Sequence, residues 1–267
     1  MNKESRLQEA YLSRLEKQRR KIMAARILLA LAFFLLWETA ADRGWIDSFF
    51  FSSPSRLGRL FLSMWRDGSL FLHVGITLTE TLVSFALVVV ISLAVSLLLW
   101  LSDSVFQVLE PYLVILNSLP KSALAPLLIV WLGANSRTII VAGMSVAIFG
   151  TILNLYTGFT ETSREKIRLI YTLHGTKKDA LTKVVLPSTV PMIISIMKVN
   201  IGLCLVGVVI GEFIGARNGL GYLIIYGSQV FQLDLVILSI LILCLMAMLL
   251  YGGVTAAEKL YHRRQHA

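Results

Sequence analysis

The stretch TLVSFALVVVISLAVSLLLWL, residues 81–101, contains no charged side chain. About 20 consecutive apolar residues are enough for an α-helix to cross the hydrocarbon core of a bilayer, so this stretch predicts a transmembrane helix. Its apolar residues are continuous, whereas the strands of a membrane β-barrel alternate in polarity over about ten residues. The whole chain agrees, because 56% of its 267 residues are hydrophobic and only 15% are charged, compared with about 25% charged residues in a soluble domain.

Five further stretches extend this pattern along the chain, and we expect an all-α membrane protein with six transmembrane helices. The third stretch contains Pro111, Pro120 and Pro126; prolines remove helical hydrogen bonds and bend helices, so it is the least regular. The first is longer than the apolar core of a signal peptide, which has about 7–15 residues, and we expect it to be retained. The six spans are residues 22–41, 81–101, 105–132, 137–159, 188–211 and 235–257.

Basic residues indicate how the helices are oriented. Eight Lys and Arg lie in residues 1–26, six in residues 159–187 and three after residue 257. The connections on the other side contain fewer, with four in residues 42–73. By the positive-inside rule, both termini and the loop at 160–187 are predicted to be cytoplasmic, in a multi-pass membrane protein. The net charge of +9 then reflects membrane topology, and we expect no nucleic-acid partner.

The segments outside the spans suggest a simple organisation. Leu7, Tyr11 and Leu15 share a helical face, which predicts either an amphipathic helix against membrane lipid or another subunit, or a charged extension of the first span. Residues 49–73 contain another amphipathic run, with Trp65 as an interfacial anchor. The predicted parts are an N-terminal helix (1–21), the first span (22–41), an extracytoplasmic connection (42–75), a core domain (76–258) and a cytoplasmic tail (259–267).

The loop at 160–187, TETSREKIRLIYTLHGTKKDALTKVVLP, is too long for a simple turn between spans. Apolar residues recur at helical spacing before and after Gly175, which predicts two short amphipathic helices bent at His174–Gly175. Such a pair either presents a knob to a cytoplasmic partner or packs on lipid.

The end of this loop, TLHGTKKDALTKVVLPSTVP, resembles the EAA loop of the permease subunits of bacterial ABC importers. That loop starts with Glu-Ala-Ala, has a glycine four residues on and closes with Leu-Pro. Aligned without a gap from Leu186–Pro187, Arg168 stands in the acidic position and His174 in the glycine position. With a one-residue deletion Gly175 takes the glycine position instead, and the sequence leaves both alignments open.

Three other segments are similar to the nitrate, sulfonate and taurine branch of that family, and their order holds over most of the chain. The chain also lacks the GxxxxGK(S/T) phosphate-binding loop, so ATP hydrolysis is expected on a separate protein. The three segments are GSLFLH at 68–73 followed by Thr77, LPKSALAP at 119–126 followed by WLG at 131–133, and GEFIG at 211–215 followed by GLG at 219–221 and Asp234.

The resemblance implies the type I ABC importer permease fold and a transport subunit rather than an enzyme. Its expected partners are a second permease copy, most economically an identical one, two cytoplasmic ABC ATPases and an extracytoplasmic solute-binding protein. The ATPases would bind ATP and Mg²⁺, with no cofactor or metal on this chain. The loop would dock in a groove of the ATPase, with Tyr171, Leu173 and Leu181 as the buried contact. The implied coupling residues are Arg168, Tyr171, Leu173, His174, Gly175, Lys177, Lys178, Leu181, Lys183, Leu186 and Pro187.

Polar residues within the spans are candidates for a translocation path. Lys198 lies ten residues past Ser188, about 15 Å into the fifth span, where a charge is costly unless it faces protein or water. It either attracts an anionic solute or has a structural partner. Asparagines within spans more often form hydrogen bonds between helices than line a path. Glu80 stands where the branch often has a basic residue, which weakens the argument for an anion. The path candidates are Asn117, Lys121, Asn154, Lys198 and Asn200; the candidates for an outer gate, where a plain loop is also consistent, are Glu212, Gly219 and Gly221.

Through this resemblance, we expect the permease subunit of an ATP-driven importer for a small polar solute such as an aliphatic sulfonate, taurine or nitrate. A thiamine-precursor pyrimidine or riboflavin is the alternative solute. An ion-gradient-driven secondary carrier fits less well, because no repeat relates the two halves of the chain. A membrane-embedded enzyme is disfavoured, because the chain has no HExxH motif and no paired acids within the spans, and Cys204 and Cys244 lack metal-binding spacing.

Overall fold

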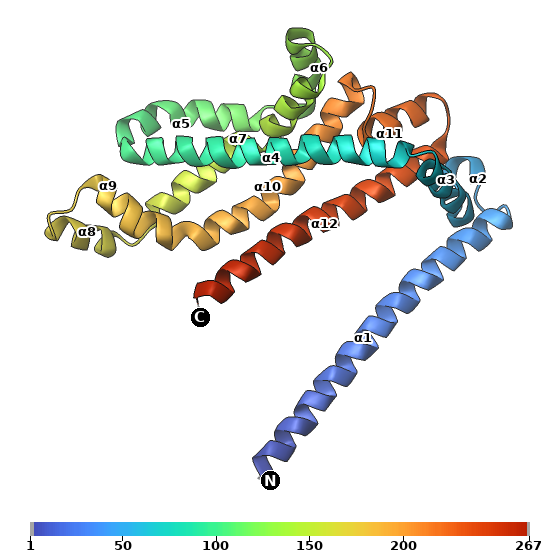
Figure 1. Cartoon of the computed structure of the whole chain (residues 1–267), viewed down its shortest axis with the longest axis horizontal. Coiled ribbons are helices and arrows are strands. Elements are labelled where there is room, and N and C mark those ends of the chain that lie inside the picture. Colours follow the sequence, from blue (N-terminus) through green and yellow to red (C-terminus); the bar gives the residue numbers. More distant parts are fainter. Residues whose placement is uncertain (1–2, 266–267) are drawn as a thin grey trace. The chain divides into compact units, whose positions relative to one another are not determined.

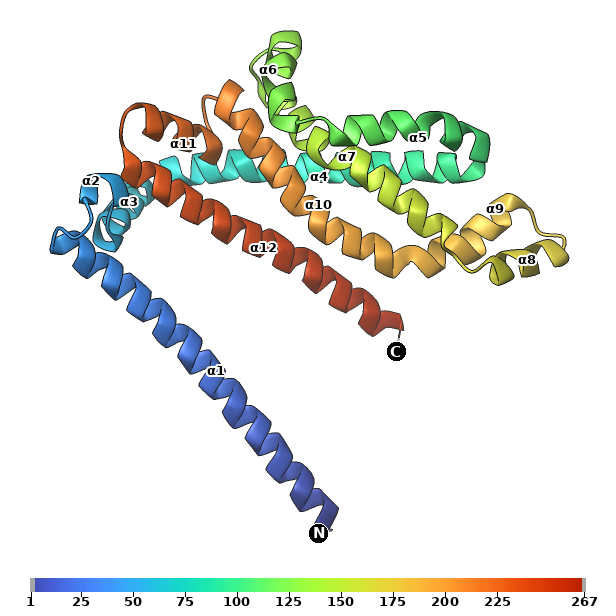
Figure 2. The ribbon, with the colours of Figure 1, turned by 180° about the vertical axis from the view of Figure 1, so that it is seen from behind.

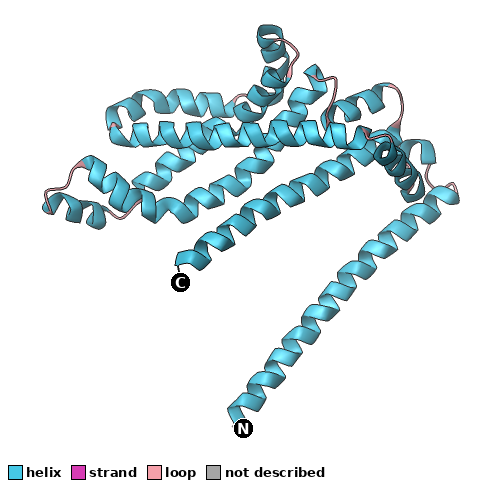
Figure 3. Ribbon diagram, in the orientation of Figure 1, coloured by secondary structure: helices cyan, strands magenta, loops and turns pink. Residues whose placement is uncertain are grey.

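The computed structural model describes the backbone of residues 3–265 and the side chains of residues 17–259, and all regular elements in these ranges are helices (Figure 3). The predicted all-α fold class is confirmed. The chain forms two compact units, one ending at Ser63 and the other beginning at Met64.

The first unit contains α1 (Lys3–Asp42), α2 (Ser48–Phe51) and the beginning of α3 (Pro54–Arg66) (Figure 1). α1 has no break, so the predicted N-terminal helix and the first span are one continuous helix from residue 3 on. The apolar face predicted for residues 1–21 concerns side chains outside the described residues. The turns after α1 are held by two hydrogen bonds, from Ser55 N–H to the Glu38 carboxylate (3.0 Å) and from Trp37 Nε1 to the Phe51 carbonyl (3.2 Å).

The helix α3 is the amphipathic run predicted in the connection. Leu57 and Met64 are buried while Trp65 remains exposed, as expected for a helix with one apolar face. The Trp65 ring also packs edge-on against Phe71, with 4.6 Å between the ring centroids.

Three long helices that pack against one another, α4, α7 and α10, form the centre of the second unit (Figure 2). Small residues permit this close packing: a Cβ atom on Gly207 of α10 would lie 2.8 Å from the Cα of Gly143 on α7. α4 contributes the buried Ser84, Ser92 and Ser96, whose hydroxyls donate to carbonyls of their own helix. The helices that follow α3 are α4 (Ser69–Leu101), α5 (Asp103–Ser118), α6 (Lys121–Leu132), α7 (Ser136–Thr160), α8 (Arg164–Thr172), α9 (Lys177–Ala180), the π-helical turn η1 (Leu181–Val185), α10 (Leu186–Gly215), α11 (Leu220–Gln229) and α12 (Leu233–Gln265).

Five of the described helices are long and apolar enough to cross a membrane. The first, second, fourth, fifth and sixth predicted spans lie within α1, α4, α7, α10 and α12, and each helix is longer than the span predicted within it. The charge-free stretch thus marks only the most apolar part of α4, which begins 12 residues earlier, at Ser69.

The third predicted span, residues 105–132, is not one helix: α5 and α6 meet at an angle of 96°. The break falls at Leu119–Pro120, where Leu119 is extended (ψ 138°) because the ring of a following proline disfavours the helical conformation. Pro111 and Pro126 stay inside helices, so one of the three prolines accounts for the break.

Candidate functional site

The predicted coupling loop, residues 160–187, folds into two short helices, α8 and α9, as predicted. α8 ends in a Schellman turn, in which Gly175 N–H donates to the Ile170 carbonyl (2.9 Å) and His174 N–H to the Tyr171 carbonyl (3.0 Å). The left-handed residue of this turn is His174, with φ 60°, at the position where glycine is usual. His174, and not Gly175, is thus the left-handed residue of this turn.

Replacing His174 by glycine is expected to stabilise this turn, because a side chain in the left-handed region costs about 1 kcal/mol that glycine avoids. Limited trypsin digestion at the neighbouring lysines measures the effect, and cleavage should slow several-fold. Gly175→Ala is the matched control: its Cβ would lie 2.9 Å from the Ile170 carbonyl oxygen, so cleavage should become faster. Faster cleavage of the His174→Gly protein would contradict this description of the turn.

The second half of the loop is anchored in the helical core. Ala180, Leu181 and Val185 are buried in a cluster with Trp100 of α4 and Phe159 of α7. The prediction that Leu181 contacts a partner is therefore wrong, because its side chain is covered by the chain itself. Helical spacing identifies an apolar face but does not tell what covers it.

The exposed apolar surface of the loop lies on α8 and the turn after it. Leu173 is 70% exposed, Leu169 59% and Tyr171 46%; we call these three residues the loop patch. Leu169 was not predicted, because the sequence does not show that Ile167 and Ile170, rather than Leu169, pack on the buried cluster. Of the residues predicted to dock, Tyr171 and Leu173 are thus exposed and Leu181 is not, and Leu169 is exposed as well.

The predicted charged residues of the loop divide into held and exposed groups. Lys177 Nζ lies 3.7 Å from the Asp103 carboxylate and 5.4 Å from the centroid of the Trp100 ring, so it ties α9 to the turn between α4 and α5. Lys183 pairs with Asp179 one helical turn away (2.8 Å). Lys183 is nevertheless exposed, as are Arg168 and Lys178.

The loop passes directly into α10 through η1. Pro187 lies in the first turn of α10 and has no N–H, and Leu186 N–H donates to the Leu181 carbonyl five residues back, which makes a π-turn. Leu186 also packs on the buried cluster. The predicted junction at Leu186–Pro187 is thus a continuous helical connection between the loop and α10.

Three of the predicted path residues lie together, although they come from three helices. Asn117 of α5, Asn154 of α7 and Asn200 of α10 line a cavity of about 280 Å³, which we call the asparagine cavity. Thr151 adds a hydroxyl group to otherwise mostly apolar walls. Asn200 is 3% exposed, and its Nδ2 has no hydrogen-bond partner among the described residues. Gly150 leaves room, since a Cβ there would lie 3.0 Å from the Asn117 Oδ1.

The two predicted path lysines do not line this cavity. Lys121 Nζ donates to the carbonyls of Leu116 (2.6 Å) and Asn117 (2.8 Å), which lie at the end of α5 and have no helical donor. Lys198 of α10 forms an ion pair with Glu258 of α12. Of the two roles considered for Lys198, the structural one is thus given a specific partner, the Glu258 carboxylate.

This ion pair predicts recovery in a double mutant. Lys198→Met alone leaves the largely buried Glu258 carboxylate without its partner, which costs up to about 3–5 kcal/mol and should lower the Tm of the purified protein. Adding Glu258→Met should recover most of the Tm and of the solute uptake. A double variant that folds normally but transports as poorly as Lys198→Met would instead place Lys198 in contact with the solute.

The predicted gate residues come together around a buried carboxylate. Glu212 accepts hydrogen bonds from Thr77 Oγ1 (2.7 Å) and from Gly221 N–H (2.6 Å). Gly219, with φ 115°, has no room for a Cβ against Glu212, and its N–H donates to His73 Nδ1 (3.0 Å). The segment between α10 and α11 is therefore fastened to α4 by specific contacts. His73 and Thr77 belong to a segment that resembles the family, but their spacing on one helical face did not predict that they hold the segment between α10 and α11.

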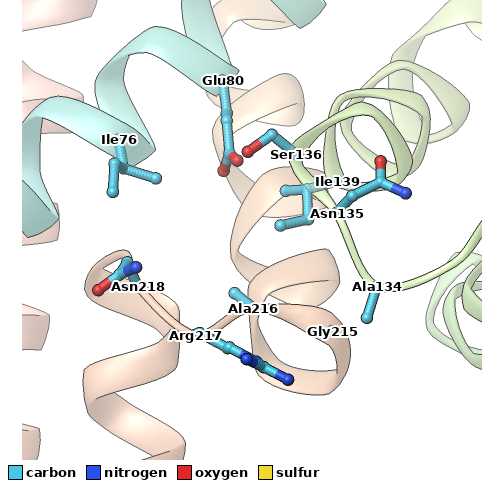
Figure 4. Close-up of a pocket in the computed structure, with 10 residues that line it drawn as sticks. All are labelled: Ile76, Glu80, Ala134, Asn135, Ser136, Ile139, Gly215, Ala216, Arg217 and Asn218. Atoms are coloured by element: carbon cyan, nitrogen blue, oxygen red, sulfur yellow. The ribbon is translucent and has the colours of Figure 1, made fainter.

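A second cavity, of about 190 Å³, opens beside this segment (Figure 4). Glu80 is 3% exposed and points into the cavity next to Ser136 (Figure 4); we call this cavity the Glu80 pocket. The sequence marked Glu80 as unusual but did not predict a pocket, because three distant segments form it. The lining residues are Ile76, Glu80, Ala134, Asn135, Ser136, Ile139, Gly215, Ala216, Arg217 and Asn218.

Sequence comparisons identify relatives that match most of the chain. Residues 89–265 match the family described as binding-protein-dependent transport system inner membrane component. A probable ABC transporter permease protein of Haemophilus influenzae is 29% identical, over 89% of this chain and 95% of the relative. The formylaminopyrimidine transport permease of Halalkalibacterium halodurans is 27% identical, over 87% and 92%. The taurine transport system permease of Escherichia coli is 24% identical, over 84% and 83%.

Solved structures agree on the fold. A chain of the MetNI methionine ABC transporter in an inward-facing conformation superposes with a TM-score of 0.60, at 20% identity, over 69% of this chain and 92% of that chain. A chain of an amino acid ABC transporter gives a TM-score of 0.55 at 18% identity, over 76% and 98%. The predicted permease fold is confirmed, in a multi-pass inner membrane protein. The chain belongs to the inner membrane components of binding-protein-dependent transport systems, the permeases of ABC importers.

Proposed function

We propose that this chain works as one of a pair of permease subunits in an ATP-driven importer for a small polar solute. The observation that carries this proposal is the loop patch, Leu169, Tyr171 and Leu173, exposed on a loop whose other half is buried in the core. An exposed apolar patch on a well-anchored loop is typical of a surface that binds another protein. The proposed partner is a cytoplasmic ABC ATPase, with two per importer.

The anchoring of the loop supports a mechanical role. The buried cluster and the contact between Lys177 and Asp103 join the loop to α4, α5 and α7, and η1 joins it to α10. Closure of two ATPases on ATP and Mg²⁺ would draw the loops of an identical permease pair together. The helices attached to the loops would then move as rigid bodies, which is the basis of alternating access. Both termini and the loop would face the cytoplasm, with a solute-binding protein on the other side.

The asparagine cavity is the proposed binding site for the solute along the translocation path. Carboxamide side chains both donate and accept hydrogen bonds, so Asn117, Asn154 and Asn200 suit a polar solute of either charge. The volume of about 280 Å³ lies just below the range of ligand pockets, which is about 300–1,000 Å³. This favours a sulfonate, taurine or nitrate over riboflavin, with a thiamine-precursor pyrimidine as the alternative.

Gentle-detergent purification of the tagged protein, with every stoichiometric partner identified by mass, tests the proposal. We expect an ATPase that carries a phosphate-binding loop, and the binding protein when solute is present. Recovery of the chain alone, together with uptake that needs no ATP, would overturn it.

A further inference from the structure

Glu80 is a buried carboxyl group whose neighbours in the described part of the chain are the Ser136 hydroxyl and the Glu212 carboxyl group, neither of which is a cation. Neither Glu80 oxygen has a hydrogen bond of ordinary geometry, and the side chain points into the Glu80 pocket (Figure 4). An ionised carboxylate is costly in a buried site without a positive charge beside it. The ionised form therefore lacks a partner that a cation in the pocket can supply.

The neighbouring Glu212 carboxylate, unlike that of Glu80, has well-placed hydrogen-bond donors. It accepts hydrogen bonds from Thr77 and from Gly221 N–H at the start of α11, a favourable place for a negative charge. The carboxyl groups of Glu80 and Glu212 are close enough to interact electrostatically, and two adjacent buried carboxylates repel each other. A cation beside Glu80 would remove this repulsion, and N–H groups on it would supply the missing hydrogen bonds.

The other walls of the pocket suit an organic amine better than a metal ion. The polar side chains near Glu80 are those of Ser136, Asn135 and Asn218, and no group of three His, Cys, Asp or Glu that could hold a metal occurs among the described side chains. The volume of about 190 Å³ exceeds that of an engineered cavity of about 150 Å³ that holds benzene. Arg217 lies on the wall opposite Glu80, with its guanidinium group directed away from Glu80 (Figure 4) and exposed.

We propose that the Glu80 pocket is a binding site for the protonated amine of the transported solute, with Glu80 as its counterion. An ammonium group brings three N–H donors and a positive charge, which matches a buried carboxylate that has no cationic partner. Among the solutes proposed above, this selects a small zwitterion such as taurine over nitrate or a sulfonate that has no amine. This inference rests on the proposed function only in assigning the amine to a transported molecule.

Thermal unfolding of the purified permease in lipid nanodiscs, with its ATPase when that copurifies, tests the proposal. The probes are ethylamine hydrochloride, sodium chloride at the same ionic strength, and ethanol. A ligand that binds only the folded protein raises its Tm, so saturating ethylammonium should raise the Tm by about 3 °C or more, and the other two should not. Glu80→Gln should abolish the shift, and Glu110→Gln, which removes an exposed carboxylate, should keep it.

Each alternative outcome is distinct. An equal shift with sodium chloride would assign the pocket to an inorganic cation, and no shift in the wild-type protein would mean that the pocket holds no cation; either overturns the proposal. A shift that persists in Glu80→Gln would also overturn it. Should Glu80→Gln not fold, Glu80→Asp keeps the charge but withdraws it from the pocket, and the ethylammonium needed for half the shift should rise several-fold. Absence of the ATPase counts against the proposed function only, because the Tm shift can be measured on the permease alone.

Discussion

Leu173→Asp is expected to abolish copurification of the ATPase while the permease still inserts and purifies as a folded protein. Leu173 is exposed in the chain alone, and surface substitutions of this kind usually change stability by no more than about 0.5 kcal/mol. In a contact with another protein, the same carboxylate would be buried without a partner, which costs several kcal/mol. We expect affinity to fall by about 100-fold or more, equivalent to about 2.7 kcal/mol, measured as the ATPase-to-permease ratio after purification.

The choice of variant and control decides how this result is interpreted. Leu181→Asp would also lose the ATPase, but for a different reason: it places a charge in the buried cluster and disrupts the fold of the loop. This variant therefore cannot test docking. Thr182→Asp is the matched control, since it adds the same charge at an exposed position of the same loop outside the loop patch. Unchanged copurification of Leu173→Asp, or equal loss with Thr182→Asp, would contradict the loop patch as the docking surface.

Asn200→Leu is expected to reduce solute uptake by about tenfold or more while leaving the Tm and the bound ATPase unchanged. Asn200 Nδ2 has no hydrogen-bond partner among the described residues, so replacing it with an apolar side chain of similar size removes no contact of the folded chain. A polar solute in the cavity would lose a partner, which costs about 1–3 kcal/mol. The measurement is the initial rate of solute uptake into liposomes together with the rate of ATP hydrolysis. A fall in uptake with unchanged hydrolysis shows a defect in the solute path rather than in the contact with the ATPase.

Ser239→Ala is the control for this substitution. It likewise removes a buried polar group without a partner, but Ser239 lies on α12 and does not line the asparagine cavity. Its uptake should equal that of the wild-type protein. Normal uptake by Asn200→Leu would show that the solute does not pass Asn200, and an equal fall with Ser239→Ala would point to a general structural effect.

The positions of five of the six spans could be predicted because membrane crossing imposes a length and a composition that a single sequence displays, whereas the sharp break between α5 and α6 in the third could not. The coupling loop could be predicted because helical periodicity and the family motif coincide there. Periodicity does not distinguish Leu173 from Leu181, however, since both lie on apolar faces. One is exposed and the other is buried by α4 and α7, and only the packing of distant helices decides this.

The cavities show the same limit. Asn117, Asn154 and Asn200 were each visible as polar residues within apolar runs, but nothing in the sequence indicates that α5, α7 and α10 bring them to one cavity. Lys198 looked like a path residue because its partner, Glu258, is 60 residues away on α12. Ion pairs and cavities between helices depend on contacts that no local pattern contains.

Uptake into liposomes that contain this permease with its copurified ATPase and binding protein tests the central claim most directly. The solute is the one that the binding protein carries, and ATP with Mg²⁺ is supplied on the side of the ATPase. The account predicts that solute accumulates only with hydrolysable ATP and that ionophores dissipating proton and sodium gradients have no effect. Accumulation without ATP that collapses when the ionophores are added would contradict it and make the protein an ion-driven carrier.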